Sequence, residues 1–138
     1  SVFPIRYVTK EDFMLEIILI TGVLVFLQLT LPTMLAVTTG SANANYLAGP
    51  RDVPMENMAT SVARAKRAGN NLLETLPVFL TLAVLSIIME VQTAELAAIW
   101  LGLRVAYVFA YLMGIYYIRT LIWFGSIFCL IMMGLALI

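Results

Sequence analysis

The sequence predicts an all-α protein, an integral membrane four-helix bundle. Of its 138 residues, 62% are hydrophobic and only 12% are charged, which is more apolar surface than a soluble domain of this size can bury. The apolar residues lie in long continuous runs, unlike the alternating segments of ~10 residues that build a membrane β-barrel. At ~20 residues per span, with short connections, the chain accommodates about four helices. We expect one transmembrane domain, residues 1–138, with helices over residues 13–37, 54–89, 94–114 and 118–138.

The first helix and the loop after it carry the features of a membrane segment and a turn. Gln28 lies deep in the apolar run, where an amide is expected to bond across to another helix. Pro32 permits a kink there. Residues 38–51 contain Gly, Ser, Asn and Pro, which favour turns. A loop of this length either caps a site or connects two helices through solvent.

The second helix is expected to begin at Pro54, with Asp52 or Val53 as its cap. Its periodicity continues to residue 89, and such a helix would reach ~50 Å at 1.5 Å per residue, well beyond a ~30 Å hydrocarbon core. Its first turns are therefore expected to protrude into water. Pro77 cannot donate to the carbonyl of the preceding turn, which predicts a bend just past Glu74.

Polar residues gather on one stripe of this second helix. At ~100° per residue, Arg64, Arg67, Asn71 and Glu74 share one face. Charged groups near hydrocarbon are costly, so this face should meet the bundle interior, a partner subunit or a watery cavity. The stripe is expected to form one wall of a polar binding site.

The third helix carries a matching stripe. Arg104, Tyr107 and Tyr111 stand at offsets 0, 3 and 7 and so share a face. A short turn joins helices two and three, which makes them antiparallel neighbours whose stripes can meet. Glu74 and Arg104 both lie inside the membrane and each needs a partner. We expect them to pair, within a subunit or between subunits.

The remaining polar residues suit a small anion. Guanidinium, amide and phenol groups come from Arg67, Asn71, Tyr107, Tyr111 and Arg119, and such groups recognise a ligand with carboxylates and amides. For the tyrosines, an interfacial aromatic belt is the alternative interpretation.

Charge and cysteine content exclude several classes of function. The formal net charge is zero, so nothing favours nucleic acid as a partner. The sequence has no histidine and one cysteine, Cys129; an internal disulfide is excluded and no metal site is expected. Cys129 lies in the last apolar run, where we expect a packed thiol.

The distribution of charge predicts the topology. With four spans, the loop after the first helix and the turn before the fourth share a side, which holds Arg51, Arg64, Lys66, Arg67 and Arg119. The positive-inside rule places this side in the cytoplasm and both termini outside.

Two motifs in this chain resemble a known family. Residues 64–77 read R-A-x-R-A-x-x-N-x-x-E-x-x-P, residues 104–111 read R-x-x-Y-x-x-x-Y, and Arg119-Thr120 follows. In this order and on these helices, the motifs resemble the MAPEG family, the membrane-associated proteins in eicosanoid and glutathione metabolism. The spacing is more similar to the bacterial branch than to the eicosanoid synthases, which implies the inner membrane of a bacterium.

The resemblance implies a homotrimer of four-helix subunits, with bent glutathione as co-substrate between neighbouring subunits on the cytoplasmic side. It implies that Arg67, Asn71 and Glu74 contact the tripeptide from one subunit, and that Tyr107 and Tyr111 do so from the next.

The resemblance also implies the catalytic pair. Arg119 would lie beside the thiol, where a guanidinium favours thiolate over thiol. Thr120 could donate a hydrogen bond to the sulfur.

The chain departs from the eicosanoid synthases at two places. Asn70 stands where those relatives often have an arginine, and residues 13–37 hold no arginine or lysine near the cytoplasmic end of the first helix. These departures argue against leukotriene or prostaglandin synthesis.

Three functions follow as hypotheses. The first is a glutathione-dependent transferase or peroxidase that acts on lipophilic electrophiles or lipid hydroperoxides, which enter from the bilayer. The second is a non-catalytic MAPEG-like scaffold, lipid-binding protein or accessory subunit of a membrane complex. The third, a transporter or channel, lacks the paired broken helices of transporters. The first hypothesis also leaves open that the co-substrate is a thiol other than glutathione.

Overall fold

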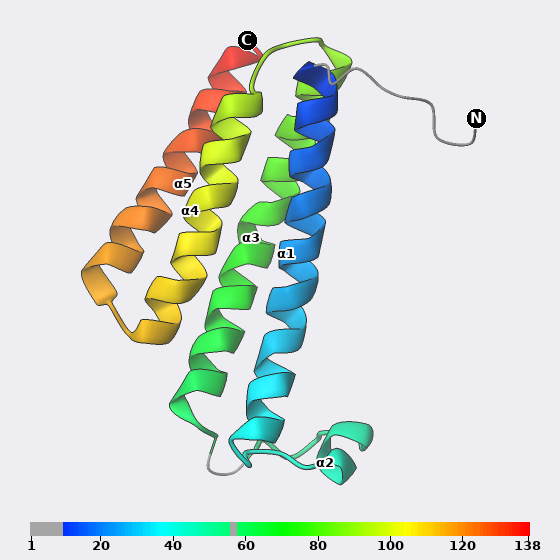
Figure 1. Ribbon diagram of the computed structural model, residues 1–138, viewed down its shortest axis with the longest axis vertical. Coiled ribbons are helices and arrows are strands. Elements are labelled where there is room, and N and C mark those ends of the chain that lie inside the picture. Colours follow the sequence, from blue (N-terminus) through cyan, green and yellow to red (C-terminus); the bar gives the residue numbers. More distant parts are fainter. Residues whose placement is uncertain (1–9, 56–57) are drawn as a thin grey trace, which may run out of the picture.

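The computed structural model describes residues 10–55 and 58–138. The helices are α1 (Lys10–Thr38), α2 (Ala44–Ala48), α3 (Thr60–Ile88), α4 (Ala94–Met113) and α5 (Tyr116–Ala136) (Figure 1). Within these residues no strand forms. The four longer helices are long and apolar enough to cross a membrane. The predicted class, an all-α membrane bundle with four spans, is confirmed.

The four long helices run up and down beside one another. α1 lies against α3, and α4 lies against both α3 and α5 (Figure 1). The first described turn of α1 and the C-terminus lie at one end of the bundle, and α2 lies at the other. The antiparallel pairing of α3 and α4 brings the two polar stripes of the sequence onto facing helices.

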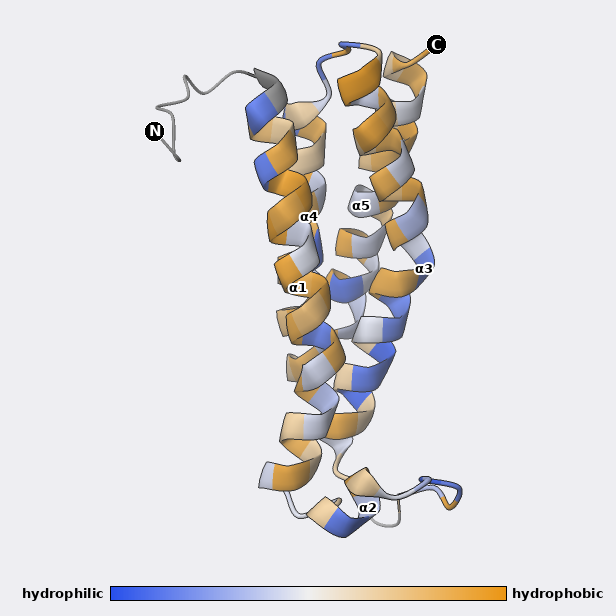
Figure 2. Cartoon of the chain, turned by 90° about the vertical axis from the view of Figure 1, so that its right-hand side faces the viewer, coloured by the Kyte–Doolittle hydropathy of each residue, from blue (hydrophilic) through white to orange (hydrophobic). Residues whose placement is uncertain are grey.

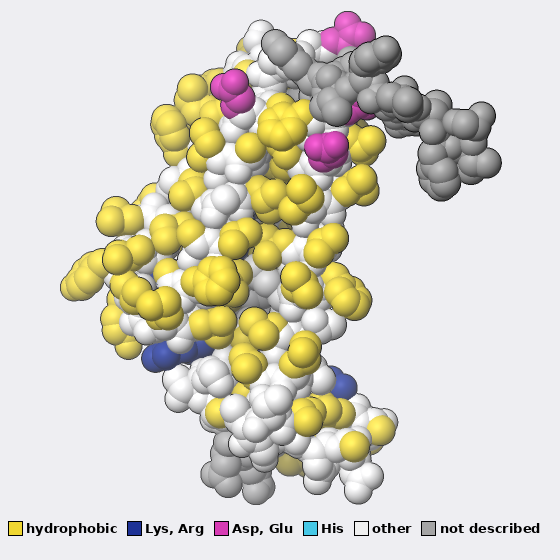
Figure 3. Space-filling model, viewed as in Figure 1, with side chains coloured by type: hydrophobic (Ala, Val, Ile, Leu, Met, Phe, Trp, Pro, Cys, Tyr) yellow, Lys and Arg dark blue, Asp and Glu magenta, His cyan; other side chains and the backbone are white. Residues whose placement is uncertain are grey.

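The core is built mainly from α3, α4 and α5. The rings of Phe79 and Trp100 stack at 3.9 Å between centroids, with an interplanar angle of 6°. Cys129 and Met133 of α5 are buried in the same cluster, so the prediction of a packed thiol at Cys129 is confirmed. Hydrophobic residues predominate along the long helices (Figure 2), and large apolar side chains cover their outer faces (Figure 3). Such a surface is stable only against lipid or another apolar partner.

The prediction that the second helix begins at Pro54 is wrong. α3 begins at Thr60, and its cap residue Ala59 has an extended backbone with φ −60° and ψ 146°. The Ala59 N–H donates to Ser41 Oγ at 2.9 Å, which fixes this turn against the beginning of the preceding loop, just after α1. The loop instead forms the short helix α2, whose cap residue Asn43 accepts from the Tyr46 N–H at 2.8 Å.

The predicted bond from Gln28 to another helix is also wrong within this chain. Gln28 is 4% exposed, and among residues 10–55 and 58–138 neither its amide nitrogen nor its amide oxygen has a hydrogen-bond partner. The backbones of α1 and α3 approach closely at this level, since a Cβ placed on Gly69 would lie 3.3 Å from the Gln28 backbone oxygen. Gly69 has no side chain that could offer the amide a partner.

Candidate functional site

The polar stripe of α3 lies against the C-terminal half of α4 and the start of α5. Arg67 and Glu74 are exposed, while Arg64 and Asn71 are half-buried. Figure 2 shows the hydrophilic residues of α3 gathered in the half of the helix nearer to α2.

A cavity of about 260 Å³ lies between α3, the C-terminal end of α4 and the first turn of α5. We call it the basic cavity. Its lining residues are Thr60, Arg64, Arg67, Ala110, Tyr111, Gly114, Ile115, Tyr116 and Arg119. Three of these side chains are guanidinium groups, and no acidic side chain of the described chain lines the cavity. Its electrostatics therefore favour an anion. None of the described loop residues between α1 and α3, 39–55 and 58–59, lines this cavity.

Tyr111 is held between two guanidinium groups at the centre of this cavity. Arg67 Nε donates to the Tyr111 hydroxyl at 3.0 Å. The Arg119 Cζ lies 4.5 Å from the Tyr111 ring centroid, a cation–π contact. Because the phenol oxygen accepts from Arg67, its own proton is available to donate to a ligand in the cavity.

Arg119 and Thr120 enter the site from the first turn of α5. Only Gly114 and Ile115 separate α4 from α5, so the start of α5 lies beside the end of α4. Arg119 is half-buried and lines the cavity. Thr120 is exposed, and its hydroxyl donates to the Tyr116 carbonyl at 3.1 Å. The predicted pair is thus adjacent in the chain, but only Arg119 lines the basic cavity.

Arg64 belongs to the predicted stripe and lines the cavity, although it was not among the residues expected to contact the ligand. Its Nη1 donates to the Leu112 carbonyl at 3.1 Å, at the C-terminal end of α4. The signal for it was present, because Arg64 lies one turn before Arg67 on the same stripe. The stripe identified the face of the helix, but the contact to α4 depends on the register between the two helices.

A second polar cluster, Asn71, Arg104 and Tyr107, lies deeper in the bundle. We call it the deep cluster. Arg104 is fully buried, and its Nη1 donates to Asn71 Oδ1 at 2.8 Å. The Arg104 Cζ lies 4.5 Å from the centroid of the Tyr107 ring. Tyr107 meets Tyr111 edge to face at 5.6 Å, which links the deep cluster to the basic cavity.

The expected pairing of Glu74 with Arg104 does not form within the described chain. Arg104 bonds to Asn71 instead, and its Nε and Nη2 have no hydrogen-bond partner. Asn71 lies one turn before Glu74 and faces α4, whereas Glu74 is exposed on the outside of the bundle. Pairing of Glu74 with a neighbouring subunit stays a prediction.

The aromatic-belt alternative fails for Tyr107 and fits two other tyrosines. Tyr107 is only 5% exposed and contacts Arg104 inside the bundle. Tyr116 and Tyr117 are 67% and 87% exposed at the start of α5, which is the placement expected of residues at a membrane interface.

Comparison with known proteins then decides the family. The family model of the MAPEG family matches residues 17–138. This chain belongs to the MAPEG family. Neither the curated proteins nor the solved structures contain a match to it. The matched range of this MAPEG protein includes α3, α4 and α5 completely, together with the basic cavity and the deep cluster. Its membership and its four spans make it an integral, multi-pass membrane protein.

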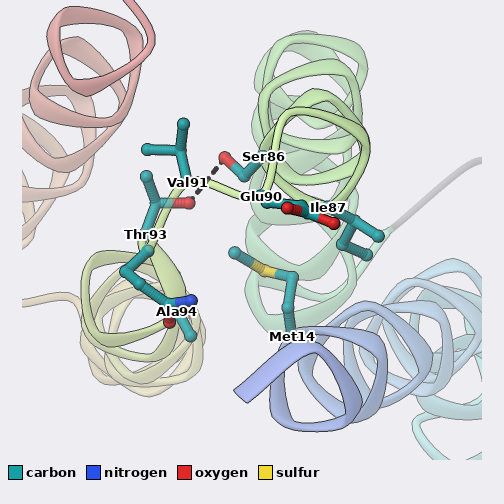
Figure 4. Close-up of a pocket in the computed structure, with 8 residues that line it drawn as sticks. Met14, Ser86, Ile87, Glu90, Val91, Thr93 and Ala94 are labelled. Atoms are coloured by element: carbon teal, nitrogen blue, oxygen red, sulfur yellow. Dashed lines mark hydrogen bonds between the residues drawn. The ribbon is translucent and has the colours of Figure 1, made fainter. Parts of the chain in front are cut away.

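Another pocket of this MAPEG protein lies at the turn between α3 and α4 (Figure 4). Met14, Ser86, Glu90 and Thr93 are among its lining residues, and Thr93 Oγ1 donates to Ser86 Oγ at 2.6 Å. Its volume of about 10 Å³ holds one water molecule at most. No predicted site residue lines it, so the basic cavity is the better candidate for a ligand site.

Proposed function

We propose that this MAPEG protein is a glutathione-dependent transferase or peroxidase that acts on lipophilic electrophiles or lipid hydroperoxides. The observation that carries the proposal is the basic cavity, in which Arg67 and Arg119 both contact Tyr111. A family with glutathione-related activities gives that cavity a chemical context. A thiol that carries carboxylates is the ligand that best matches three guanidinium groups.

Each residue has a role in this proposal. Arg67 attracts a carboxylate of glutathione, and Tyr111 donates the phenol proton that Arg67 leaves free. Glu74 suits the glutathione ammonium group, because its exposed carboxylate has no hydrogen-bond partner in the described chain. Asn71 and Tyr107 support the site from the deep cluster: the Asn71 amide oxygen accepts from Arg104, and the Tyr107 ring packs on Tyr111.

The proposed chemistry rests on Arg119. A guanidinium close to the glutathione sulfur favours the thiolate, which is the nucleophilic form. The thiolate then forms a bond from sulfur to an electrophilic carbon, which releases its leaving group as an anion. With a hydroperoxide, the thiolate attacks the terminal oxygen and the O–O bond breaks; the alkoxide takes a proton and leaves as the alcohol, and the glutathione sulfenic acid reacts with a second glutathione to give the disulfide and water. Thr120 takes a minor part, because its hydroxyl proton is directed to the Tyr116 carbonyl.

The proposed assembly is a homotrimer. The volume of the basic cavity, about 260 Å³, is just below the usual range for ligand pockets, ~300–1,000 Å³. A neighbouring subunit would enlarge the site by adding a further wall to it. Asn70 and Glu74 are exposed on the outer face of α3 within a membrane-spanning helix. Polar groups at that depth are costly against lipid, and a second copy of the chain would cover them.

The proposed location is a bacterial inner membrane, with the basic cavity on the cytoplasmic side. On the face that Figure 3 shows, the Lys and Arg side chains lie toward the α2 end, and the Asp and Glu side chains lie toward the end with the C-terminus. The positive-inside rule then supports entry of glutathione from the cytoplasm and of lipophilic substrates from the bilayer.

The first experiment measures glutathione binding to the detergent-purified protein, followed by ultraviolet difference absorbance of the thiolate near neutral pH. S-methylglutathione is the matched control, because it keeps the carboxylates and has no ionisable thiol. Binding with a thiolate signal supports the proposal, and a screen of electrophiles and lipid hydroperoxides follows. An absence of binding at millimolar glutathione would refute it.

The alternative function is a non-catalytic scaffold, lipid-binding protein or accessory subunit. The observation that favours it is the absence of two arginines that are typical of the eicosanoid synthases. Asn70 is exposed at the place where those proteins often have an arginine, and residues 13–37 contain no basic side chain. Glutathione binding without any thiolate signal would support this alternative.

A further inference from the structure

We infer that Arg64 is a positioning residue that caps α4 and fixes the distance between Tyr111 and Arg119. This inference rests on the proposed function for its link to catalysis. The cap itself rests on contacts within the chain.

The C-terminal end of α4 has four backbone carbonyls without partners inside the helix, those of residues 110–113. Gly114, with φ +74°, donates to the Tyr111 carbonyl, and Ile115 donates to the Ala110 carbonyl at 3.0 Å. This pair of bonds is a Schellman arrangement. Arg64 Nη1 then donates to the Leu112 carbonyl at 3.1 Å. The α3 residue thus satisfies a carbonyl that the local turn leaves open.

Gly114 shows how closely Arg64 is held. A Cβ on Gly114 would lie 2.9 Å from Arg64 Nη2 and 3.1 Å from Arg64 Cζ. The guanidinium therefore rests directly on the glycine backbone, in a place that a larger residue would occupy. A positive φ at this position is a second reason for glycine.

This contact matters because the turn is so short. Tyr111 directly precedes Leu112, and α5 begins at Tyr116, one turn before Arg119. Any shift of residues 112–115 would move Arg119 relative to Tyr111, whose ring lies 4.5 Å from the Arg119 Cζ. The positive charge of Arg64 also faces the negative end of the α4 dipole, which favours its place there.

The alternative role for Arg64 is a third cation for the ligand, because it also lines the basic cavity. Two substitutions separate the roles. Arg64→Gln removes both the charge and the cap. Gly114→Ala keeps the charge of Arg64, displaces its guanidinium from the turn and strains the backbone at φ +74°. Gly102→Ala is the control for an added methyl group, because Gly102 lies within α4 and a Cβ there meets nothing within 4 Å.

The experiment measures glutathione affinity and the midpoint pH of the thiolate signal for all variants. We expect Arg64→Gln and Gly114→Ala each to raise the midpoint by about one unit, a tenfold loss of thiolate at a given pH, with affinity changed about threefold or less. Arg64→Lys, which can still donate to the Leu112 carbonyl, should recover part of the loss. Gly102→Ala should match the wild type.

The inference is overturned if Gly114→Ala matches Gly102→Ala while Arg64→Gln weakens glutathione binding alone, since Arg64 would then be a ligand cation. If the wild type binds no glutathione, the proposed function fails, and hydrogen exchange of residues 110–119 tests the cap without it. Faster exchange there in both Arg64→Gln and Gly114→Ala supports the cap, and exchange equal to that of Gly102→Ala refutes it.

Discussion

The basic cavity and the deep cluster use the same chemistry at two depths. Each combines arginine with tyrosine. The basic cavity joins Arg67 of α3, Tyr111 of α4 and Arg119 of α5, whereas the deep cluster joins Arg104 and Tyr107, both of α4. The two tyrosines touch. The difference lies in access, because Arg104 is fully buried whereas Arg67 is exposed and Arg119 is half-buried.

Solvent access to the guanidinium groups separates a structural role for the deep cluster from a functional role for the basic cavity. A buried guanidinium must find its partners inside the protein, and Arg104 finds Asn71 and the face of Tyr107. An accessible guanidinium keeps part of its donor capacity for a ligand. We therefore expect substitutions in the deep cluster to change stability, and substitutions in the basic cavity to change thiol chemistry.

The largest effect is expected from Asn71→Leu. It removes the hydrogen-bond acceptor of a fully buried guanidinium, and uncompensated buried charge makes such changes cost about 3 kcal/mol or more. Arg104→Met instead leaves a neutral amide unpaired and should cost about 2 kcal/mol. The measurement is the free energy of unfolding in mixed micelles.

The double variant Asn71→Leu with Arg104→Met sharpens this result. Because both polar groups are then gone, its cost should be smaller than the sum of the two single costs by about 1 kcal/mol or more. Strictly additive costs would show that the 2.8 Å contact contributes nothing to stability.

Arg119→Ala tests the other half of the comparison. Loss of a cation that stabilises the developing thiolate should reduce turnover about 100-fold, or about 3 kcal/mol, and abolish the thiolate absorbance at neutral pH. The free energy of unfolding should stay within about 0.5 kcal/mol of the wild type. Arg51→Ala, in the exposed loop, is the control and should leave both unchanged. Full activity of Arg119→Ala would remove Arg119 from the mechanism.

The four spans and the family were predictable from the sequence because they depend on local properties. Apolar runs set the spans, and the spacing of Arg67, Asn71 and Glu74 sets one face of α3. The start of α3 was missed because its turn depends on a bond from Ala59 to Ser41, 18 residues away in the chain. Proline and an acidic residue near position 54 permit a helix start and do not require one.

The side-chain partners were less predictable than the faces. A helical stripe shows that Asn71 and Glu74 share a face, but the rotation of α3 against α4 decides which one meets Arg104. The role of Arg64 was hidden for the same reason, since Leu112 is 48 residues away and offers only a backbone carbonyl. Periodicity identifies the polar wall of the site; the register of two helices sets its contacts.

Gln28→Leu is expected to have a smaller effect, and one of opposite sign. The Gln28 amide is buried and has no hydrogen-bond partner, so an apolar side chain of similar size should stabilise the protein by about 1 kcal/mol. Thermal unfolding in detergent measures this. A clear destabilisation would mean that the Gln28 amide has a hydrogen-bond partner, such as a bound water. Buried polar groups at this depth of the bundle would then make more hydrogen bonds than the direct contacts between side chains indicate.

Thr120→Val should have the smallest effect. Thr120 follows Arg119 directly, yet its hydroxyl donates to the Tyr116 carbonyl, and the residue does not line the basic cavity. Valine keeps the branched shape and removes the hydroxyl, so we expect turnover to fall less than threefold, about 0.6 kcal/mol. Kinetics at saturating glutathione measure this, with Arg119→Ala as the reference for a full loss. A drop of tenfold or more would mean that the hydroxyl leaves Tyr116 to bond the sulfur when glutathione is present. The site at the start of α5 would then include Thr120 as well as Arg119.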